Sequence, residues 1–307
     1  MSRIAFVFPG QGAQKCGMGK DFYENTEIGR SVFDRASELL GFSMPELCFE
    51  ENDRLDITEY TQAAMVTASI AMMEVLKARG VKPDVAAGLS LGEYCALVAA
   101  GVMSADDAIS TVRQRGILMQ EAVPVGEGAM AAILALDASA IEEVTGPMED
   151  VWIANYNCPG QLVIGGEQAA VDQAAALAKE LGAKRCLPLK VSGPFHTSLL
   201  APAGDALREK FKETTFGAMR IPVLFNCLGR EMGPEDTIPA LLEKQVQTSV
   251  YMEDTIRRLA ELGVDTIVEI GPGKALSGFV KKTAPAIKTY AVETCADLDA
   301  LSAALKG

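Results

Sequence analysis

Short apolar runs alternate with helical stretches through most of the chain. The runs are rich in β-branched and aromatic residues and stop at turn-forming sequences, which is typical of buried strands. Helices are expected between them, for example a buried helix over 91–100 and another over 251–262. Strands that alternate with helices predict an α/β fold with a mainly parallel sheet covered on both faces. The expected strands are 3–8, 85–89, 222–226, 266–270 and 289–292.

The middle of the chain has a different order of elements. Val171, Ala174, Ala178 and Leu181 fall on one face at helical spacing. The pattern of the whole segment predicts strand, helix, strand, strand, helix and strand, which is the order of a ferredoxin-like unit. These elements are expected at 129–136, 138–144, 151–157, 162–165, 171–181 and 184–190.

This order predicts two structural parts. A small subdomain over 124–191 is inserted into a catalytic core formed by 1–123 and 192–307. The insert is bounded by two loop-forming sequences, Pro124-Val125-Gly126 and Ser192-Gly193-Pro194.

Composition and charge argue against several classes of protein. The chain has 307 residues, about half of them apolar, so it can bury a sizeable core. Its formal charge of −13 argues against nonspecific nucleic-acid binding, which needs clustered Lys and Arg. Seven scattered Cys and a single His favour neither a disulfide framework nor a metal site. Because no signal peptide or membrane-spanning run is visible, we expect a cytoplasmic protein.

Gly88-Leu89-Ser90-Leu91-Gly92 matches the G-x-S-x-G pattern of a serine nucleophile, between an expected strand and an expected helix. Such a turn presents the Ser90 hydroxyl and places the Leu91 N–H at a helix N-terminus, where it can stabilise an oxyanion. The pentapeptide alone fits a chance loop equally well. The flanking elements favour the nucleophile.

A serine hydroxyl needs a base, and His196 is the only histidine in the chain. It follows a loop-forming sequence, which is where functional residues concentrate. The alternative is a structural histidine that its neighbours satisfy. Since no acidic residue is marked as its partner, a backbone carbonyl could orient the ring and give a dyad.

Six motifs occur in order along nearly the whole chain, and together they resemble the malonyl-CoA:acyl-carrier-protein transacylases of bacterial fatty acid synthesis. They are Phe8-Pro9-Gly10-Gln11-Gly12-Ala13-Gln14, Gly88-Leu89-Ser90-Leu91-Gly92-Glu93-Tyr94, Arg115-Gly116 with Met119-Gln120-Glu121-Ala122, Asn157-Cys158-Pro159-Gly160-Gln161, Gly193-Pro194-Phe195-His196 and Glu269-Ile270-Gly271-Pro272-Gly273.

The resemblance implies a hydrolase-like core with an inserted ferredoxin-like subdomain. It implies a ping-pong reaction that moves a malonyl group from malonyl-CoA, through a malonyl-serine at Ser90, to the phosphopantetheine thiol of acyl carrier protein. No permanently bound cofactor and no metal would be needed, and we expect a monomer.

The resemblance also implies roles for further residues. The backbone N–H of Gln11 would join Leu91 in the oxyanion hole, and Arg115 would pair with the malonyl carboxylate. A glutamine carbonyl would orient His196. Gln245 fits this role by spacing, but Ser249-Val250 stands where the family has Pro-Val, so Gln247 is the alternative. The family's frequent His before the nucleophile is Leu89 here. Met119 and Phe195 are candidate walls of the acyl pocket.

Helical periodicity gives Arg115 independent support. With Ser104 as N-cap, Arg115 lies near the edge of an apolar helix face, where a charge should be paired. A structural salt bridge is the rival interpretation. The members of this face are Ala105, Ile109, Val112, Gly116 and Met119.

Other functions remain open at this point. A polyketide-type acyltransferase and a serine thioesterase or esterase share the nucleophile turn, and a non-catalytic carrier-binding module could keep the fold alone. Acyl carrier proteins are acidic, as this chain is, so docking would need a local basic patch. Lys281-Lys282 and Lys184-Arg185 are the two candidates.

Overall fold

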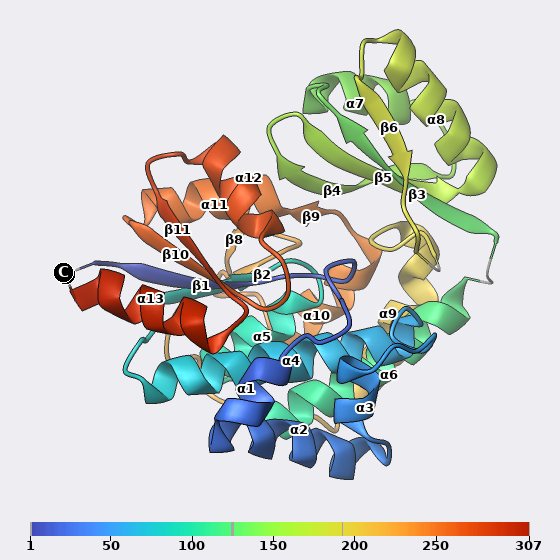
Figure 1. The fold of residues 1–307 in the computed structure, drawn as a ribbon. Helices are drawn as coiled ribbons and strands as arrows, with labels where there is room; N and C mark the ends of the chain where they lie inside the picture. The colour runs from blue at the N-terminus through green and yellow to red at the C-terminus, as the bar shows by residue number, and fades with distance from the viewer. Residues whose placement is uncertain (1, 124–125, 192, 307) are drawn as a thin grey trace.

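The computed structural model describes residues 2–123, 126–191 and 193–306, and its main body is built on one twisted sheet (Figure 1). The strand order is β11-β10-β1-β2-β7-β8. All neighbours are parallel except β7 and β8, which confirms the predicted mainly parallel sheet. The two-residue β8 was not expected. The strands are β1 (Ile4–Phe8), β2 (Val85–Gly88), β7 (Val223–Phe225), β8 (Arg230–Glu231), β10 (Thr266–Ile270) and β11 (Lys288–Val292).

The central strand β1 shows why both faces of this sheet are covered. Phe6 and Phe8 pack into the large core cluster formed with α2, α4, α5 and α6, whereas Ala5 and Val7 pack into a second cluster with α11 and α12. Alternate residues of a strand point to opposite faces, so a strand that is apolar throughout needs helices on both sides.

The helices of this body fall into two layers (Figure 1). One layer packs on the sheet face that carries Phe6 and Phe8. It includes α1 (Lys20–Asn25), α2 (Glu27–Leu40), α3 (Met44–Phe49), α4 (Thr58–Ala78), α5 (Gly92–Ala99), α6 (Ala105–Ala122), α9 (Ala201–Phe211), α10 (Ile238–Gln247) and α13 (Cys295–Lys306). The opposite layer has α11 (Met252–Glu261) and α12 (Ala275–Thr283). A short 3₁₀ turn, Ser198–Leu200, precedes α9.

A second sheet forms a smaller body beside the first (Figure 1). Its elements follow the predicted βαββαβ order, and the fold class is confirmed. They are β3 (Gly128–Leu134), α7 (Ala138–Thr145), β4 (Val151–Cys158), β5 (Gln161–Glu167), α8 (Gln168–Glu180) and β6 (Arg185–Pro188). The predicted insert boundaries fall partly on 124–125 and 192, outside the described residues, so the division at 124–191 stays a prediction.

The second sheet has a fifth strand that local patterns did not indicate. β9 (Val250–Tyr251) comes from the main body and pairs in parallel with β4, giving the order β6-β3-β5-β4-β9. The Ser249 hydroxyl donates to the Ile153 carbonyl, and the Tyr156 and Tyr251 rings stack. These contacts join segments about a hundred residues apart, so they fix the small body against the large one.

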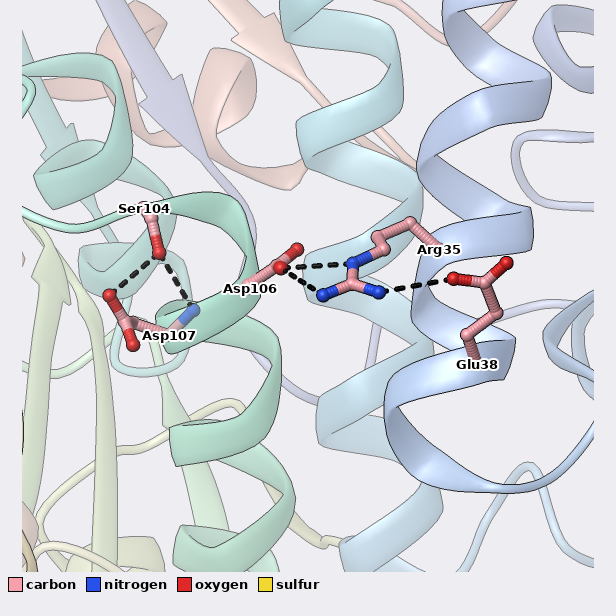
Figure 2. Close-up of polar contacts among 5 residues, drawn as sticks. All are labelled: Arg35, Glu38, Ser104, Asp106 and Asp107. Atoms are coloured by element: carbon pink, nitrogen blue, oxygen red, sulfur yellow. Dashed lines mark hydrogen bonds and ion pairs between the residues drawn. The ribbon is translucent and has the colours of Figure 1, made fainter.

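The start of α6 is fixed by its N-cap (Figure 2). The Ser104 hydroxyl accepts a hydrogen bond from the Asp107 N–H at 3.0 Å, as predicted. Next to it, Asp106 pairs with Arg35 of α2 at 2.8 Å. A helix with a defined first residue also has a defined phase, so the cap decides which face Arg115 occupies about three turns later.

Within the described ranges, no helix combines the length and the apolar content that crossing a bilayer requires.

Candidate active site

Ser90 occupies a tight turn between β2 and α5. Its φ of 50° lies in the left-handed region, which is strained for a residue with a Cβ. The flanking glycines are required for close packing. A Cβ on Gly88 would come within 2.0 Å of the Gly92 carbonyl carbon, and a Cβ on Gly92 within 2.2 Å of the Phe8 carbonyl oxygen. The turn therefore projects Ser90 at the carboxyl end of β2, where parallel α/β sheets bind ligands.

His196 meets this hydroxyl, with Ser90 Oγ 2.7 Å from His196 Nε2. The other ring nitrogen, Nδ1, lies 2.7 Å from the Gln245 carbonyl oxygen. Because a carbonyl can only accept, Nδ1 carries the proton and Nε2 has its lone pair toward Ser90. His196 also has a positive φ, 61°, and its N–H donates to the Val246 carbonyl. The arrangement is a serine–histidine pair held by a backbone carbonyl.

The environment keeps His196 in its neutral, basic form. Burial and then the positive charge of Arg115 lower the pKa of His196 to about 4, although the hydrogen bond to the Gln245 carbonyl acts in the opposite direction. At neutral pH the imidazole can therefore accept a proton.

Arg115 is 1% exposed and points at the same hydroxyl. Its Nη2 donates to Ser90 Oγ at 3.2 Å and to Gln245 Oε1 at 3.1 Å, and its Nη1 donates to Gln62 Oε1 at 2.9 Å. The face of Tyr94 lies 5.7 Å from the guanidinium carbon. Among the ion pairs of the described residues none includes Arg115. Among the described residues the rival salt bridge is thus not formed, and the side chains that hold this buried charge offer neutral oxygens.

Gln245 links the three reactive groups. Its carbonyl receives the His196 hydrogen bond, its Nε2 donates to the Ser90 carbonyl at 2.9 Å, and its Oε1 accepts from Arg115. Gln247, the sequence alternative, lies instead against Gly204 of α9. Although Ser249 stands where the family has a proline, it is still Gln245 whose carbonyl binds His196 Nδ1.

Gln11 and Leu91 lie on adjacent loops after the paired strands β1 and β2. The Leu89 N–H donates to the Phe8 carbonyl, which ties the two loops together. The Gln11 side chain is engaged with Thr58 at 3.1 Å and with Gln62 at 3.4 Å. This leaves its main chain for the predicted oxyanion role, while Leu91 presents its N–H at the first turn of α5.

A cavity of about 220 Å³ lies above Ser90. It is lined by the two reactive residues, by Gln11 and Arg115, and by both candidate wall residues, Met119 and Phe195. Its opposite wall comes from the second sheet and is mixed, with apolar Met130, Ala132 and Val163 beside polar Asn155, Asn157 and Gln161. The space suits a small acyl chain with a polar end.

Three residues of the site were not singled out from sequence. Gln62 of α4 carried no local signal. Glu93 is the charged residue in the otherwise apolar run after the nucleophile, and that break in the pattern was the available clue. Asn226, directly after β7, hydrogen-bonds the nucleophile turn. All three side chains are fully buried.

Within the part of the chain that the structure describes, no group of three or more His, Cys, Asp or Glu residues is arranged to hold a metal ion.

Comparison with known proteins decides the family. Residues 5–298 match the family model described as acyl transferase domain. The chain belongs to this family. A relative from Bacillus subtilis (strain 168), the malonyl CoA-acyl carrier protein transacylase, is 48% identical over 297 residues, which cover 95% of this chain and 94% of that protein. The family resemblance read from the motifs is confirmed.

Solved structures agree with this assignment. The crystal structure of malonyl CoA-acyl carrier protein transacylase from Clostridium perfringens has a TM-score of 0.96 and 41% identity, covering 99% of this chain and 98% of that one. A malonyl-transacylase in complex with a type II polyketide acyl-carrier protein has a TM-score of 0.94 and 38% identity, covering 99% of this chain and all of that one.

The nucleophile turn of this acyl transferase should not tolerate a side chain at its first glycine. We expect Gly88→Ala to lower the free energy of unfolding by at least about 3 kcal/mol, because backbone atoms block the new methyl group. Gly278→Ala in α12 is the matched control, since no atom lies within 4 Å of its Cβ position. Chemical denaturation measures both. Equal stabilities of the two variants would contradict the packing argument.

The single histidine allows its pKa to be measured directly by proton NMR. We expect the imidazole resonance to titrate near pH 4, below the ordinary value of about 6.5. Because the unfolded chain binds this proton first as the pH falls, the contribution to stability is lost from about pH 6.5 down to the folded pKa. Arg115→Gln removes a positive charge and should raise the pKa of His196. A wild-type value at or above 6.5 would contradict the buried environment.

Proposed function

We propose that this protein is a malonyltransferase, which moves a malonyl group from malonyl-CoA to the phosphopantetheine thiol of acyl carrier protein. One observation carries the proposal: Ser90 Oγ lies 2.7 Å from the basic nitrogen of His196 and 3.2 Å from a guanidinium, that of Arg115, without an acidic partner. A nucleophile beside a buried cation suits an acyl group that ends in a carboxylate.

In the first half-reaction, Ser90 Oγ attacks the thioester carbonyl carbon of malonyl-CoA while His196 Nε2 takes the hydroxyl proton. Negative charge develops on the carbonyl oxygen, and the backbone N–H groups of Gln11 and Leu91 stabilise it. When the carbon–sulfur bond breaks, the imidazolium returns its proton to the departing coenzyme A thiolate. The product is a malonyl ester on Ser90.

In the second half-reaction, the carrier's phosphopantetheine thiol gives its proton to His196 and attacks the ester carbonyl. The carbon–oxygen bond to Ser90 breaks, and the proton returns to the serine. The Gln245 carbonyl holds the imidazolium in both halves, since Nδ1–H stays bonded to it. No cofactor takes part, because proton transfer and acyl exchange balance between the substrates and the dyad.

Arg115 provides specificity in this scheme. Its present partners are neutral, so a substrate carboxylate gains a charge-assisted pair without displacing an acid. A substrate that lacks the carboxylate leaves the cation buried and unpaired. Met119 and Phe195 limit the room around the acyl chain.

The nearest alternative is a thioesterase or esterase, which would let water resolve the same ester. The uncompensated guanidinium favours transfer of a dicarboxylic acyl group. A polyketide carrier is the second candidate acceptor, because one similar solved structure holds such a carrier. We propose a fatty acid carrier on the basis of the bacterial relatives.

We further propose that the enzyme is a cytoplasmic monomer and that its carrier docks near the cavity mouth. Of the two candidate basic pairs, Lys281-Lys282 has the stronger support. Lys282 Nζ lies 3.5 Å from Gln161 Oε1, and Gln161 lines the cavity. Lys184 and Arg185 lie at the β6 edge of the second sheet.

Covalent malonylation tests the proposed function. Incubation with malonyl-CoA should leave a malonyl group on Ser90, which persists until a thiol acceptor is added, because a transferase passes its acyl group to a thiol rather than to water. Intact-mass measurement and peptide mapping detect it. Ser90→Ala should show no adduct, and His196→Ala should acylate at least about 1,000-fold more slowly. Rapid loss of the adduct to water would identify a hydrolase instead.

Charge removal at Arg115 tests the proposed specificity. We expect Arg115→Ala to reduce the ratio of malonyl-CoA to acetyl-CoA acylation, as kcat/KM, by at least about 100-fold, because the substrate carboxylate loses its partner. Arg113→Ala is the matched control on the same helix, since Arg113 pairs with Glu59 and lies over Tyr60. An unchanged ratio in Arg115→Ala would contradict the assigned role.

A further inference from the structure

Asn226 lies beside the nucleophile turn, and nothing in the proposed chemistry uses it. It follows β7, the strand next to β2, and its side chain is fully buried. The β2–β7 ladder is short, pairing Ala86 with Val223 and Ala87 with Leu224. Beyond that point β2 bends into the turn that carries Ser90.

The side chain of Asn226 continues the ladder where the backbone of β7 no longer does. In a parallel pair, a residue donates to the carbonyl before its partner and accepts from the N–H after it. Asn226 Nδ2 donates to the Gly88 carbonyl at 2.6 Å, and Asn226 Oδ1 accepts from the Ser90 N–H at 2.5 Å. The carboxamide thus takes the place of a strand residue opposite Leu89.

These two hydrogen bonds span the strained residue. The φ angle of Ser90, 50°, describes rotation about its N–Cα bond. Fixing the Ser90 N–H therefore resists rotation about this bond to an ordinary φ value. Without the carboxamide, the buried Gly88 carbonyl and the partly buried Ser90 N–H would both lose their partners.

Asn226 is itself held on two sides. Its backbone N–H donates to Glu93 Oε2 at 2.6 Å, and its carbonyl accepts from the Tyr251 N–H at 2.9 Å. Glu93 is fully buried in the first turn of α5, and burial raises its pKa to about 8. The acid therefore ties the helix that follows Ser90 to the strand end that carries the carboxamide.

We propose that Asn226 is a positioning residue for acyl transfer: its carboxamide completes the β2–β7 ladder and holds Ser90 in the conformation that meets His196, with Glu93 anchoring its backbone. This inference rests on the proposed role of Ser90 as nucleophile. This positioning role differs from a general stabilising role, because the reactivity of Ser90 then depends on both the Nδ2 donor and the Oδ1 acceptor of Asn226.

Asn226→Leu removes both hydrogen bonds and keeps the branched shape and the number of heavy atoms of the side chain. We expect its single-turnover acylation by malonyl-CoA to be at least roughly 100-fold slower than wild type, with KM changed by less than about threefold, because the nucleophile is misplaced while the carboxylate site stays intact. Val223→Ala is the matched control. It destabilises the same strand without touching the turn, and it should acylate within about threefold of wild type at equal folded fraction.

Asn226→Asp tests the amide pattern itself. A protonated carboxyl can accept from the Ser90 N–H and donate to the Gly88 carbonyl, as the amide does, whereas a carboxylate cannot donate. Because Asn226 is fully buried, burial should raise the pKa of a carboxyl at this position. The rate of this variant relative to wild type should therefore be within about tenfold at pH 6 and should fall as the pH rises to 9. The charged and titratable groups around it are present in both proteins, namely Glu93, Arg115, His196 and Cys227. Dividing the rate of the variant by the wild-type rate at each pH therefore cancels the effect of their titration.

The outcomes separate the two proposals. Reaction of Ser90 with a fluorophosphonate probe, followed in parallel, reports serine reactivity without malonyl-CoA. A folded Leu variant that reacts as fast as Val223→Ala in both assays overturns the inference, as does an Asp variant that reacts as fast as wild type at pH 9, where a carboxylate cannot donate to the Gly88 carbonyl. Failure of wild type to take malonyl while its serine still reacts with the probe overturns the proposed function alone.

Discussion

The left-handed turn at Ser90 is the constraint on which the site depends. A side chain with a Cβ is held at a φ of 50° only because two glycines let backbone segments approach within contact distance. That closeness places Ser90 Oγ at the carboxyl edge of the sheet, 2.7 Å from His196 Nε2. The loops that follow β1, β2 and β7 all begin at this edge, because parallel strands run in the same direction.

Burial of charge is the second theme of the site. Arg115 is held almost without exposure by amide and hydroxyl oxygens, which bind its Nη1 and Nη2 but leave its Nε without a hydrogen-bond partner and its charge uncompensated. The same charge disfavours protonation of His196 and so keeps the base ready. In the proposed function, one buried cation thus serves both recognition and catalysis.

The second sheet completes the cavity and is bound to the main body through β9. Because β9 belongs to the segment just after Gln245, the strand that joins the two sheets is continuous with the carbonyl that orients His196. The apolar wall formed by Met130 and Val163 is consequently fixed relative to the reactive pair. This connection explains how a cavity shared between two sheets keeps one shape.

Much of this arrangement follows from local sequence. Apolar runs and helical periodicity located the strands and the N-cap of α6, because side-chain burial and capping are decided by neighbouring residues. The pentapeptide around Ser90 and the single histidine identified the reactive pair by chemistry and elimination. The family resemblance then supplied roles for Gln11 and Gln245, which no local pattern singled out, and a carboxylate partner for Arg115, whose helix face indicated only a buried, paired charge.

Only the tertiary structure decided which distant residues surround that pair. Gln62 contacts Arg115 across 53 residues, Asn226 contacts Ser90 across 136, and Glu93 contacts the Asn226 backbone across 133. A polar residue in an apolar segment looks the same whether or not it has such a partner. The two-residue β9 likewise carries too little pattern to be recognised, since its pairing depends on β4 being in place. Sequence determined the chemistry and the elements, whereas long-range packing determined what holds the nucleophile.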